Sequence, residues 1–296
     1  MKRVLVTGGN GFIGKHLVNS IIEGTDWYVC VLDLKQADKE IKSDRIKYVQ
    51  GDILDRGVFN HFNSIDTVYH LAAQTSSILS ERDAKKDIET NVLGTLNVCE
   101  FASHCQSALV FTSSMAIYGN QRSSVNIHSV PAPTSTYGIS KLACELLIKK
   151  YFKDKTNFLI ARLFNVYGPG QDLSNLDQGM LSIFVAMALK HGEIVVKGSP
   201  DRTRDFIHVS DVTKFLLDEK KMTGNIANVA TGSSLSVREL TVNICNMLGE
   251  DVRVKYQGGF SQDISKISCT DTELENTIPL LPDGLVEFLS WAKGSY

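Results

Sequence analysis

A tyrosine and a lysine stand four residues apart in the segment "TYGISKLACE", which spans residues 136–145. Residues at positions i and i+4 are neighbours on the surface of an α-helix, with Cβ atoms about 5–6 Å apart. A cation held that close to a phenol favours its charged form, whose unperturbed pKa is about 10. Tyr137 beside Lys141 is therefore a candidate general base. An amphipathic helix with a half-exposed tyrosine and a solvated lysine gives the same pattern, so these residues alone do not decide.

A glycine-rich segment, "TGGNGFIG" at residues 7–14, follows a short apolar run and opens a helical pattern. Gly9, Gly11 and Gly14 have the spacing of a dinucleotide-binding loop, and Gly8 forms a second, overlapping set. Such glycines permit a tight turn, let the backbone approach a pyrophosphate, and let helix and strand pack closely. The N-terminus of the helix then offers N–H groups and a positive dipole end to the phosphates. The segment predicts a dinucleotide site.

Asp33 ends the second apolar run, "YVCVLD", about 20 residues past the glycine loop. A carboxylate at this place can accept both ribose hydroxyls of NAD and would repel the 2′-phosphate of NADP. We therefore expect NAD as the cofactor. The alternative is that Asp33 simply ends a strand.

Short β-branched runs alternate with helical patterns along most of the chain. Several runs are apolar on both faces, as in strands that are covered on both sides in a parallel sheet. The pattern predicts an α/β fold with a Rossmann-type doubly wound parallel sheet and a smaller C-terminal α/β substrate domain. Strands are expected at residues 3–7, 28–33, 46–50, 67–72, 108–113 and 158–163, and helices at 83–104, 138–152, 180–191, 236–248 and 283–293.

The expected domain boundary follows the last strong strand pattern, where a loop rich in Gly, Pro, Asn and Asp occupies residues 168–179. We expect residues 1–165 to form an NAD-binding Rossmann domain, with residues 205–230 returning to it. Residues 166–204 and 231–296 are then expected to form the substrate-binding domain.

The charge of the chain is nearly balanced, with 31 Lys and Arg residues against 33 Asp and Glu residues. Without a basic patch, no nucleic-acid or membrane partner is expected. The six cysteines form no CxxC pair and no metal-ligand spacing with histidine, so we expect free thiols in a reducing cytosol and no metal site. No apolar run approaches the roughly 18 residues of a membrane span, and the first run is too short for a signal peptide. A soluble, cytoplasmic protein is expected.

Eight motifs, in order along the chain, resemble those of the extended short-chain dehydrogenase/reductase family. The resemblance is to its group of NAD-dependent nucleotide-sugar epimerases and dehydratases, which includes enzymes similar to UDP-glucose 4-epimerase. Besides the glycine loop, the motifs are "GDILD" (51–55), "HLAAQ" (70–74), "NVLGT" (91–95), "SSMAIYG" (113–119), "YGISK" (137–141), "RLFNVYGPG" (162–170) and "RDFIHVSDV" (204–212). The resemblance covers almost the whole chain. It implies a nucleotide-diphosphate sugar as the substrate and a homodimer formed through helices 83–104 and 138–152.

The resemblance assigns catalytic and substrate roles to single residues. It implies that Tyr137 is the base, that Lys141 is its partner, and that Ser114 hydrogen-bonds the sugar 4-oxygen. Asn165 matches a residue that holds the substrate phosphate, and Arg204 matches an arginine that clamps a nucleotide diphosphate. A strand cap at Ser114 and a salt bridge between Arg204 and the adjacent aspartate are the alternatives.

The same resemblance implies a cofactor-binding set. Asp52 and Ile53 match the pair that flanks the adenine, residues 71–73 match the turn under the nicotinamide ribose, and Asn91 matches a polar residue near it. The full cofactor set is Gly8, Gly11, Phe12, Ile13, Gly14, Asp33, Asp52, Ile53, Leu71, Ala72, Ala73, Asn91, Tyr137 and Lys141, and Gln74 and Ser76 join Ser114, Asn165 and Arg204 in the substrate set.

The positions after Ser114 discriminate among the family's reactions. Family dehydratases carry an Asp-Glu pair there and the decarboxylases carry a Glu, because both reactions need an acid or base at a second sugar carbon. Here Met115 and Ala116 occupy these positions, and neither can transfer a proton. We therefore expect an NAD-dependent nucleotide-sugar 4-epimerase, which forms a 4-keto sugar and reduces it on the other face. The alternatives are an NAD(P)H-dependent reductase of nucleotide-4-keto-6-deoxysugars and, more distantly, a non-catalytic NAD-sensing Rossmann protein.

The segment "YQGGFSQDIS" at residues 256–265 departs from the family pattern. Epimerases that act on UDP-sugars usually carry an arginine in an R-x-G-D pattern near the late strand. Phe260 stands where that arginine would fall, before Asp263. One contact to the diphosphate is therefore missing, or another residue such as Arg202 supplies it. The sequence leaves the sugar and its nucleotide open.

Overall fold

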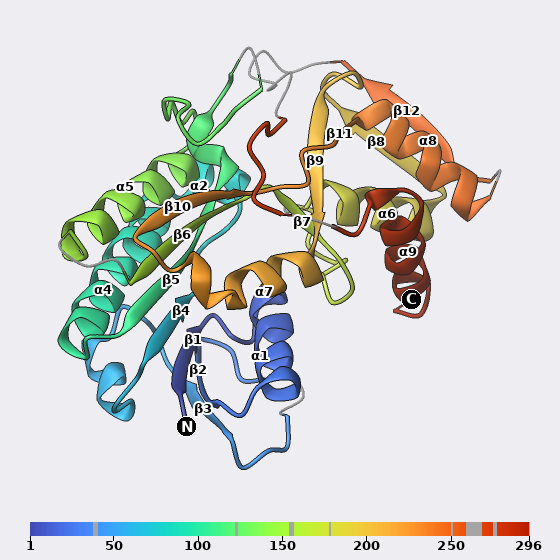
Figure 1. The fold of residues 1–296 in the computed structure, drawn as a ribbon. Helices are drawn as coiled ribbons and strands as arrows, with labels where there is room; N and C mark the ends of the chain where they lie inside the picture. Colours follow the sequence, from blue (N-terminus) through green and yellow to red (C-terminus); the bar gives the residue numbers. More distant parts are fainter. Residues whose placement is uncertain are drawn as a thin grey trace. The chain divides into compact units, whose positions relative to one another are not determined.

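We analysed a computed structural model of the chain (Figure 1). The structure describes residues 1–37, 41–121, 124–153, 157–177, 179–249, 251–258, 268–274 and 277–295. The chain forms two compact units. Unit 1 comprises Met1–Ile117, Ser135–Arg162 and Thr213–Ala227, and unit 2 comprises Tyr118–Thr134, Leu163–Val212 and Asn228–Tyr296.

A seven-stranded sheet in the order β10-β6-β5-β4-β1-β2-β3 organises unit 1. Its strands are β1 Arg3–Thr7, β2 Tyr28–Asp33, β3 Ile46–Gln50, β4 Thr67–His70, β5 Ala108–Ser114, β6 Phe158–Leu163 and β10 Asn225–Val229. β1 pairs in parallel with β2 and β4, and the pairs β2–β3 and β4–β5 are also parallel. This order reverses direction between β1 and β4, as in Rossmann folds, which confirms the predicted fold class.

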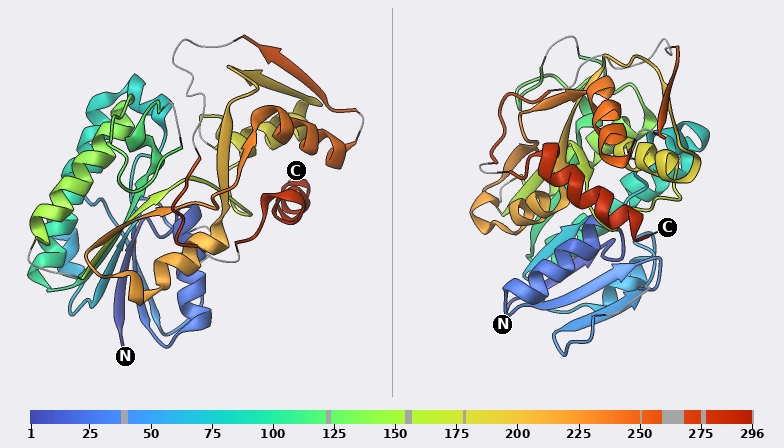
Figure 2. Two further views of the ribbon diagram at one scale, coloured as in Figure 1. Left: turned by 45° about the horizontal axis from the view of Figure 1, so that its top comes forward. Right: turned by 90° about the vertical axis from the view of Figure 1, so that its right-hand side faces the viewer.

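The strands and helices of unit 1 enclose one apolar core. The strands β1, β2, β4 and β5 are buried along most of their length, as expected for strands covered on both faces. α1 (Phe12–Gly24) covers one face, and α4 (Gly94–His104) and α5 (Thr136–Tyr151) cover the other (Figure 2). The shorter elements are η1 Arg56–His61, α2 Ser77–Arg82, η3 Met115–Tyr118, α7 Val209–Leu217 and η4 Glu219–Lys221.

The predicted helix at residues 83–104 is interrupted by a π-helical turn. It consists of α3 (Ala84–Ile88), the π-turn η2 (Glu89–Leu93) and α4. Gly94, the first residue of α4, packs against the core, and a Cβ there would lie 2.4 Å from Cδ1 of Ile53. The π-turn carries Asn91, whose side chain is buried. Such turns inside helices occur frequently at functional sites.

α5 holds a buried ion pair in unit 1. Glu145 accepts from Nε of Arg162 at 2.9 Å and from Nη2 at 2.7 Å, and the two side chains are 1% and 4% exposed. Ser113 donates to the same carboxylate at 2.6 Å. Because the fork-shaped contact satisfies both partners, α5 is fixed to the carboxyl ends of β5 and β6.

Unit 2 contains two small sheets and three longer helices. The first sheet has the order β11-β9-β7 and the second pairs β12 with β8 in parallel. α6 contacts both α8 and α9, and an apolar core lies among these helices (Figure 1). The elements are β7 Asn165–Tyr167, α6 Met180–His191, β8 Glu193–Lys197, β9 Thr203–His208, β11 Ser234–Ser236, α8 Val237–Leu248, β12 Arg253–Gln257, η5 Leu280–Gly284 and α9 Leu285–Lys293.

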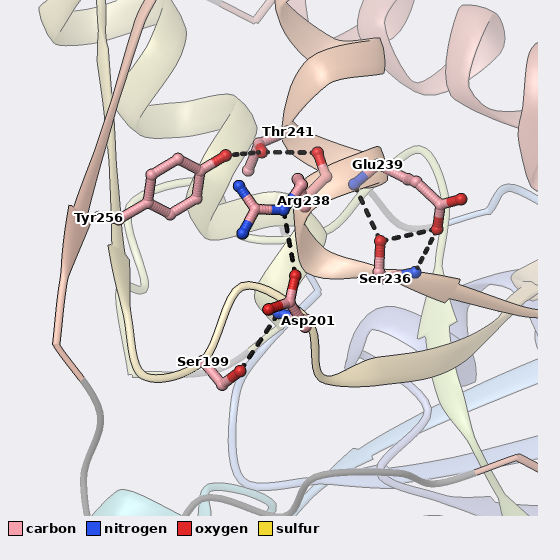
Figure 3. Close-up of polar contacts among 7 residues, drawn as sticks. All are labelled: Ser199, Asp201, Ser236, Arg238, Glu239, Thr241 and Tyr256. Carbon is pink, nitrogen blue, oxygen red and sulfur yellow. Dashed lines mark hydrogen bonds and ion pairs between the residues drawn. The ribbon is translucent and has the colours of Figure 1, made fainter.

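Hydrogen bonds and an ion pair stabilise the first turn of α8 (Figure 3). Ser236 caps the helix, accepting from the N–H of Glu239 at 3.1 Å, while the Glu239 carboxylate accepts from the N–H of Ser236 at 2.9 Å. This is a capping box. Arg238 donates to Asp201 at 3.1 Å and lies over the ring of Tyr256. These contacts hold the turn that precedes β9.

The units differ from the domains expected from the sequence in four places, and two of these are the short stretches 163–165 and 228–230, which were expected in the Rossmann domain but lie in unit 2. Residues 118–134 were expected in the Rossmann domain but lie in unit 2. Residues 205–212 also lie in unit 2, because β9 pairs with β7 and β11 rather than with the seven-stranded sheet. β10, by contrast, joins that sheet, as the sequence indicated.

Three sequence expectations concern cysteines, metals and membranes. The six cysteines are free thiols, as expected, and Cys105 and Cys245 are only partly buried. Among the described residues, no group of three or more His, Cys, Asp and Glu side chains is placed to hold a metal ion. No helix in the described ranges combines the length and apolarity needed to cross a membrane.

The buried pair on α5 predicts a large effect of Arg162→Met on stability. The change leaves the Glu145 carboxylate buried without its cation, so we expect the free energy of unfolding of unit 1 to fall by about 3–5 kcal/mol. Denaturant unfolding followed by circular dichroism measures the change. Arg238→Met, which breaks the exposed pair with Asp201, is the control and should leave the transition almost unchanged. Equal effects of the two substitutions would contradict the assignment.

Candidate active site

The glycine loop lies between the carboxyl ends of β1 and β4. Gly8 has φ +72°, and a Cβ on it would lie 2.7 Å from the backbone nitrogen of Ala72. A Cβ on Gly14 would lie 2.1 Å from the carbonyl oxygen of Gly8. Gly11 is the N-cap of α1 and has no side chain to occupy the N–H groups of the first turn. The loop is therefore a backbone cradle at a helix N-terminus, which suits a pyrophosphate.

Asp33 lies at the carboxyl end of β2 beside this loop. One carboxylate oxygen accepts from the N–H of Asn10 at 2.9 Å, and the other accepts from the N–H of Lys35 at 2.9 Å. Each oxygen keeps a lone pair for a further donor. The carboxylate is thus oriented by the loop itself and can receive two hydroxyl groups. This arrangement fits the ribose of NAD.

The other predicted cofactor residues surround the same end of the sheet. Phe12 and Ile13 begin α1. The turn at residues 71–73 is fixed to the end of β1, because the N–H groups of Leu71 and Ala72 donate to Thr7 at 3.1 and 3.3 Å.

The predicted adenine pair lies just after β3. Asp52 accepts from the N–H of Leu54 at 2.9 Å. Ile53 is 6% exposed and points into the core toward Gly94. Only the backbone of Ile53 and the Asp52 carboxylate are thus placed to meet a bound group, and their role stays a prediction.

Ser114, Tyr137 and Lys141 are brought together in unit 1. Ser114 ends β5 and hydrogen-bonds the phenol of Tyr137. Lys141 is 3% exposed, donates to the carbonyl of Thr112 at 2.9 Å, and has its nitrogen 5.9 Å from the centre of the Tyr137 ring. Tyr137 itself is 8% exposed, and its N–H donates to the hydroxyl of Ser80 at 3.1 Å. The half-exposed tyrosine of an ordinary amphipathic helix is excluded by this burial.

Burial dominates the acid–base properties of these two groups. It raises the pKa of Tyr137 to about 12, and the hydrogen bond from Ser114 offsets only part of the rise. Burial also lowers the pKa of Lys141. Desolvation is therefore the largest influence on the pKa of Tyr137, and the role of Tyr137 as a general base beside Lys141 stays a prediction.

Gln74, Ser76 and Asn91 form one buried hydrogen-bond network. The side-chain oxygen of Asn91 accepts from the backbone N–H of Gln74 at 2.8 Å. The side-chain nitrogen of Asn91 donates to the backbone carbonyl of Gln74 at 3.0 Å. The Gln74 side chain donates to Asp87 at 2.7 Å and accepts from the N–H of Ser76 at 2.5 Å. Ser76 caps α2 through the N–H of Leu79. These side chains brace the turn after β4, and direct contact with a ligand stays a prediction for them.

Asn165 and Arg204 lie on neighbouring strands of unit 2. Asn165 on β7 stands opposite Phe206 of β9 and donates to the carbonyl of Asp205 at 2.7 Å. Arg204 is 8% exposed and donates to the carbonyl of Thr203 at 2.8 Å. The carboxylate of the adjacent Asp205 accepts from the N–H groups of residues 231 and 232 at 2.9 and 2.8 Å. Phe260 and Asp263 lie outside the described residues.

Residues 4–230 match the model of the NAD dependent epimerase/dehydratase family. This match spans more than half of the chain. The chain belongs to this family. Its members are NAD-dependent enzymes, so this family member is an enzyme with NAD as its cofactor, and the non-catalytic alternative is set aside.

The relatives of this family member cover more than one reaction. A protein of Methanocaldococcus jannaschii named "Putative UDP-glucose 4-epimerase" is 36% identical over 244 residues, which cover 80% of this chain and 79% of that protein. UDP-glucuronic acid decarboxylase 6 of Arabidopsis thaliana is 32% identical over 270 residues, covering 86% of this chain and 76% of the plant protein. The crystal structure of UDP-glucose 4-epimerase from Thermotoga maritima with UDP-glucose has a TM-score of 0.90 and 28% identity, and each chain covers 99% of the other.

The sequence reasoning missed several side chains that support the site of this epimerase/dehydratase family member. Asp87 and Ser140 are buried and hydrogen-bond Asn91, and Ser80 holds the start of α5. Asp87 stands four residues before Asn91, and residues at this spacing are neighbours on a helix, so the sequence did contain a signal for the contact between them. The π-turn that brings the two together has no signal in the hydrophobic pattern.

Replacing Asp33 tests how this family member selects its cofactor. Asp33→Ala removes two charge-assisted hydrogen bonds, each worth about 1.5–3 kcal/mol, so NADH should bind at least about tenfold more weakly. NADPH binding should be unchanged or tighter, because the repulsion of the 2′-phosphate is lost. Fluorescence titration with both nucleotides measures the ratio. Asp26→Ala, at an exposed position, is the control. Equal affinity of the unmodified protein for NADH and NADPH would contradict the role of Asp33.

Proposed function

We propose that the protein is an NAD-dependent nucleotide-sugar 4-epimerase, with Ser114, Tyr137 and Lys141 as its catalytic residues. Such an enzyme oxidises a sugar hydroxyl at C4 and reduces the 4-keto sugar on its other face. The similarity to a protein named as a UDP-glucose 4-epimerase, at 36% identity, supports this reaction.

The observation that carries the proposal is the chemistry of the residues after Ser114. Met115 and Ala116 begin η3, and the N–H of Ala116 donates back to the Ser114 hydroxyl at 3.2 Å. Elimination of water or loss of carboxylate needs an acid or base at a second sugar carbon. A thioether and a methyl group supply none, so only the proton transfer at one hydroxyl remains.

The chain's own residues supply that proton transfer. Tyr137 exchanges the proton of the sugar hydroxyl, and Ser114 bridges sugar oxygen and phenol because a hydroxyl both donates and accepts. Lys141 is oriented by the carbonyl of Thr112 and keeps further N–H groups for a bound ligand. NAD, when bound, supplies a hydride acceptor and the positive charge that the buried phenol needs to ionise.

Unit 2 carries the residues proposed for the nucleotide diphosphate. The guanidinium of Arg204 can donate two parallel charge-assisted hydrogen bonds to phosphate oxygens. Its low exposure and its place on β9 fix its orientation. Asn165, one strand away on β7, is proposed to hold the same phosphates.

We also propose that the protein is a homodimer. α5 exposes Ile139 and Leu146, and α3 and η2 expose Ile88 and Leu93, with exposed fractions of 51%, 59%, 37% and 47%. Ile139 and Leu146 are seven residues apart, so they lie on one face of α5. Exposed apolar residues concentrated on adjacent helices favour burial against a second copy.

Isotope-labelled substrates test the reaction. NAD-bound protein is incubated with UDP-sugars and dTDP-sugars that carry deuterium at C4, and the products are analysed by NMR, which distinguishes C4 epimers and locates the deuterium. An epimerase returns the deuterium to the same carbon and consumes no added NADH. Tyr137→Phe should lower kcat by about 10²–10⁴-fold while NAD remains bound, because only the proton-transfer group is lost.

The other outcomes identify the competing function. Transfer of the C4 deuterium to released NADH together with a 4-keto sugar, or consumption of NADH with a 4-keto sugar, would replace the proposal by the reductase, which the phenylalanine at position 260 favours. Full activity of Tyr137→Phe would contradict the catalytic assignment.

The dimer is tested by Leu146→Glu. A charge in the centre of the apolar face of α5 should convert the dimer to a monomer, as measured by light scattering. Leu176→Glu is the matched control, since Leu176 is a leucine of similar exposure, 52%, in unit 2. A monomeric unmodified protein would contradict the homodimer.

A further inference from the structure

Asp87 is a fully buried acid with one unsatisfied oxygen. Its side chain, on α3, is 0% exposed, and Oδ2 accepts from Gln74 at 2.7 Å and from Asn91 at 3.2 Å. Oδ1 is also buried, and no donor among the described residues reaches it. Both partners of Oδ2 are amide donors, which suit an ionised carboxylate. A buried carboxylate with a bare oxygen is costly unless a positive charge lies close to it.

A chain of hydrogen bonds through Asn91 and Ser140 connects Asp87 to α5. The Asn91 amide that donates to Asp87 also contacts the hydroxyl of Ser140 at 3.1 Å. Ser140 in turn donates to the carbonyl of Tyr137 at 3.0 Å. α3 packs against α5 within unit 1. Asp87 therefore has a fixed position relative to Tyr137 and Lys141.

Lys141 is the buried cation on which Asp87 acts, since the Asp87 carboxylate raises the pKa of its ammonium group. The other acid near it, Glu145, is already paired with Arg162 and accepts from Ser113. His70, which faces Lys141 from β4, has its pKa lowered by burial to about 3 and is neutral at pH 7. In the described part of the chain, Asp87 is thus the buried carboxylate near Lys141 that has no cation of its own.

The remaining groups around Tyr137 carry no competing charge. Cys144, one turn beyond Lys141 on α5, has its pKa raised by burial and is a neutral thiol. Ser114 faces the phenol from β5. Glu81 of α2 accepts from the N–H of Thr136 with an exposed carboxylate, where solvent screens its charge. Among the described residues, the acid whose charge raises the pKa of the Tyr137 phenol is therefore Asp87.

We propose that Asp87 is a positioning residue whose carboxylate is the counter-charge of the buried Lys141 ammonium and thereby sets the pH at which Tyr137 ionises. This inference rests on the proposed function of Tyr137 and Lys141. The negative charge keeps Lys141 protonated although it is buried, and the same charge opposes a second negative charge on the phenol. With a neutral phenol the pair is balanced, and a phenolate is favoured only when a further positive charge enters the site. Asp87 would thus couple ionisation of Tyr137 to the presence of the oxidised cofactor.

The electrostatic directions agree with this geometry. Desolvation is the largest influence on Lys141 and lowers its pKa, whereas Cys144, Asp87 and Glu145 raise it. Desolvation is also the largest influence on Tyr137 and raises its pKa, and Asp87 raises it further. Removal of the negative charge should therefore lower the pKa of both groups.

Tyrosinate absorbance titration of the NAD-bound protein tests the proposal without any turnover. The signal of Tyr137 is isolated by subtracting the titration of a matched Tyr137→Phe protein. Asp87→Asn should lower the pKa of Tyr137 by about one pH unit, as expected for loss of a nearby like charge. In an active enzyme, the acidic limb of the kcat/KM profile should shift the same way.

Asp83→Asn is the matched control, because it removes the same charge only one helical turn away. Asp83 is exposed and caps α3 by accepting from the N–H of Lys86 at 3.0 Å, and asparagine caps equally well. This variant should leave the pKa of Tyr137 unchanged. An unchanged pKa in Asp87→Asn, or the same shift in both variants, would overturn the proposal. A protein that shows this shift but no epimerase activity would contradict only the proposed function.

A stability cycle with Lys141→Met keeps the proposal testable where Asp87→Asn folds poorly. Lys141→Met removes the cation, so the Asp87 carboxylate becomes an unpaired buried charge. Adding Asp87→Asn to Lys141→Met should then raise the melting temperature, whereas the same change in the unmodified protein should lower it. If Asp87→Asn lowers the melting temperature, or prevents folding, equally in both backgrounds, Asp87 is not the counter-charge of Lys141.

Discussion

The close approach of the backbone at Gly8 to the backbone of Ala72 is the contact on which the cofactor end of the sheet depends. With no Cβ at Gly8, the loop after β1 can lie against the turn after β4, and Gly14 can then lie under the loop. Any side chain at Gly8 would push the two strand ends apart. The same contact places the N-terminus of α1, the Asp33 carboxylate and the turn at 71–73 around one edge of the sheet. The close contact between these two backbone segments is therefore required before the side chains at this end of the sheet can take their positions.

Burial of charge is the second constraint. Four charged side chains of unit 1 are less than 5% exposed, namely Lys141, Asp87, Glu145 and Arg162. Of these, Glu145 and Arg162 form an ion pair. A buried charge without a partner is expensive, so these groups must be positioned together. The consequence is that Tyr137 lies in a low-dielectric environment in which each added or removed charge has a large effect.

The segment between Ser114 and Tyr137 belongs largely to unit 2, although both residues belong to unit 1. Residues 118–134 leave unit 1 and are held in unit 2, where Val125 forms a parallel bridge with Cys269. Asp271 accepts from the N–H of Ile127 at 2.5 Å and from Asn228 at 2.9 Å. The segment that joins Ser114 to α5 is therefore fixed by contacts within unit 2.

The sequence by itself determined the elements whose signals are local. The alternation of apolar runs and helical patterns predicted the α/β fold with its doubly wound parallel sheet, and the glycine spacing with Asp33 predicted the dinucleotide site, because strands, turns and caps depend on neighbouring residues. The spacing of Tyr137 and Lys141 indicated a shared helix face. Only the tertiary structure decided that burial is the largest influence on the pKa of Tyr137, that a π-turn carries Asn91 between the buried side chains of Asp87 and Ser140, and that residues 118–134 belong to unit 2. Desolvation and charge pairing depend on everything packed around a group, and that packing is assembled from segments far apart in the sequence.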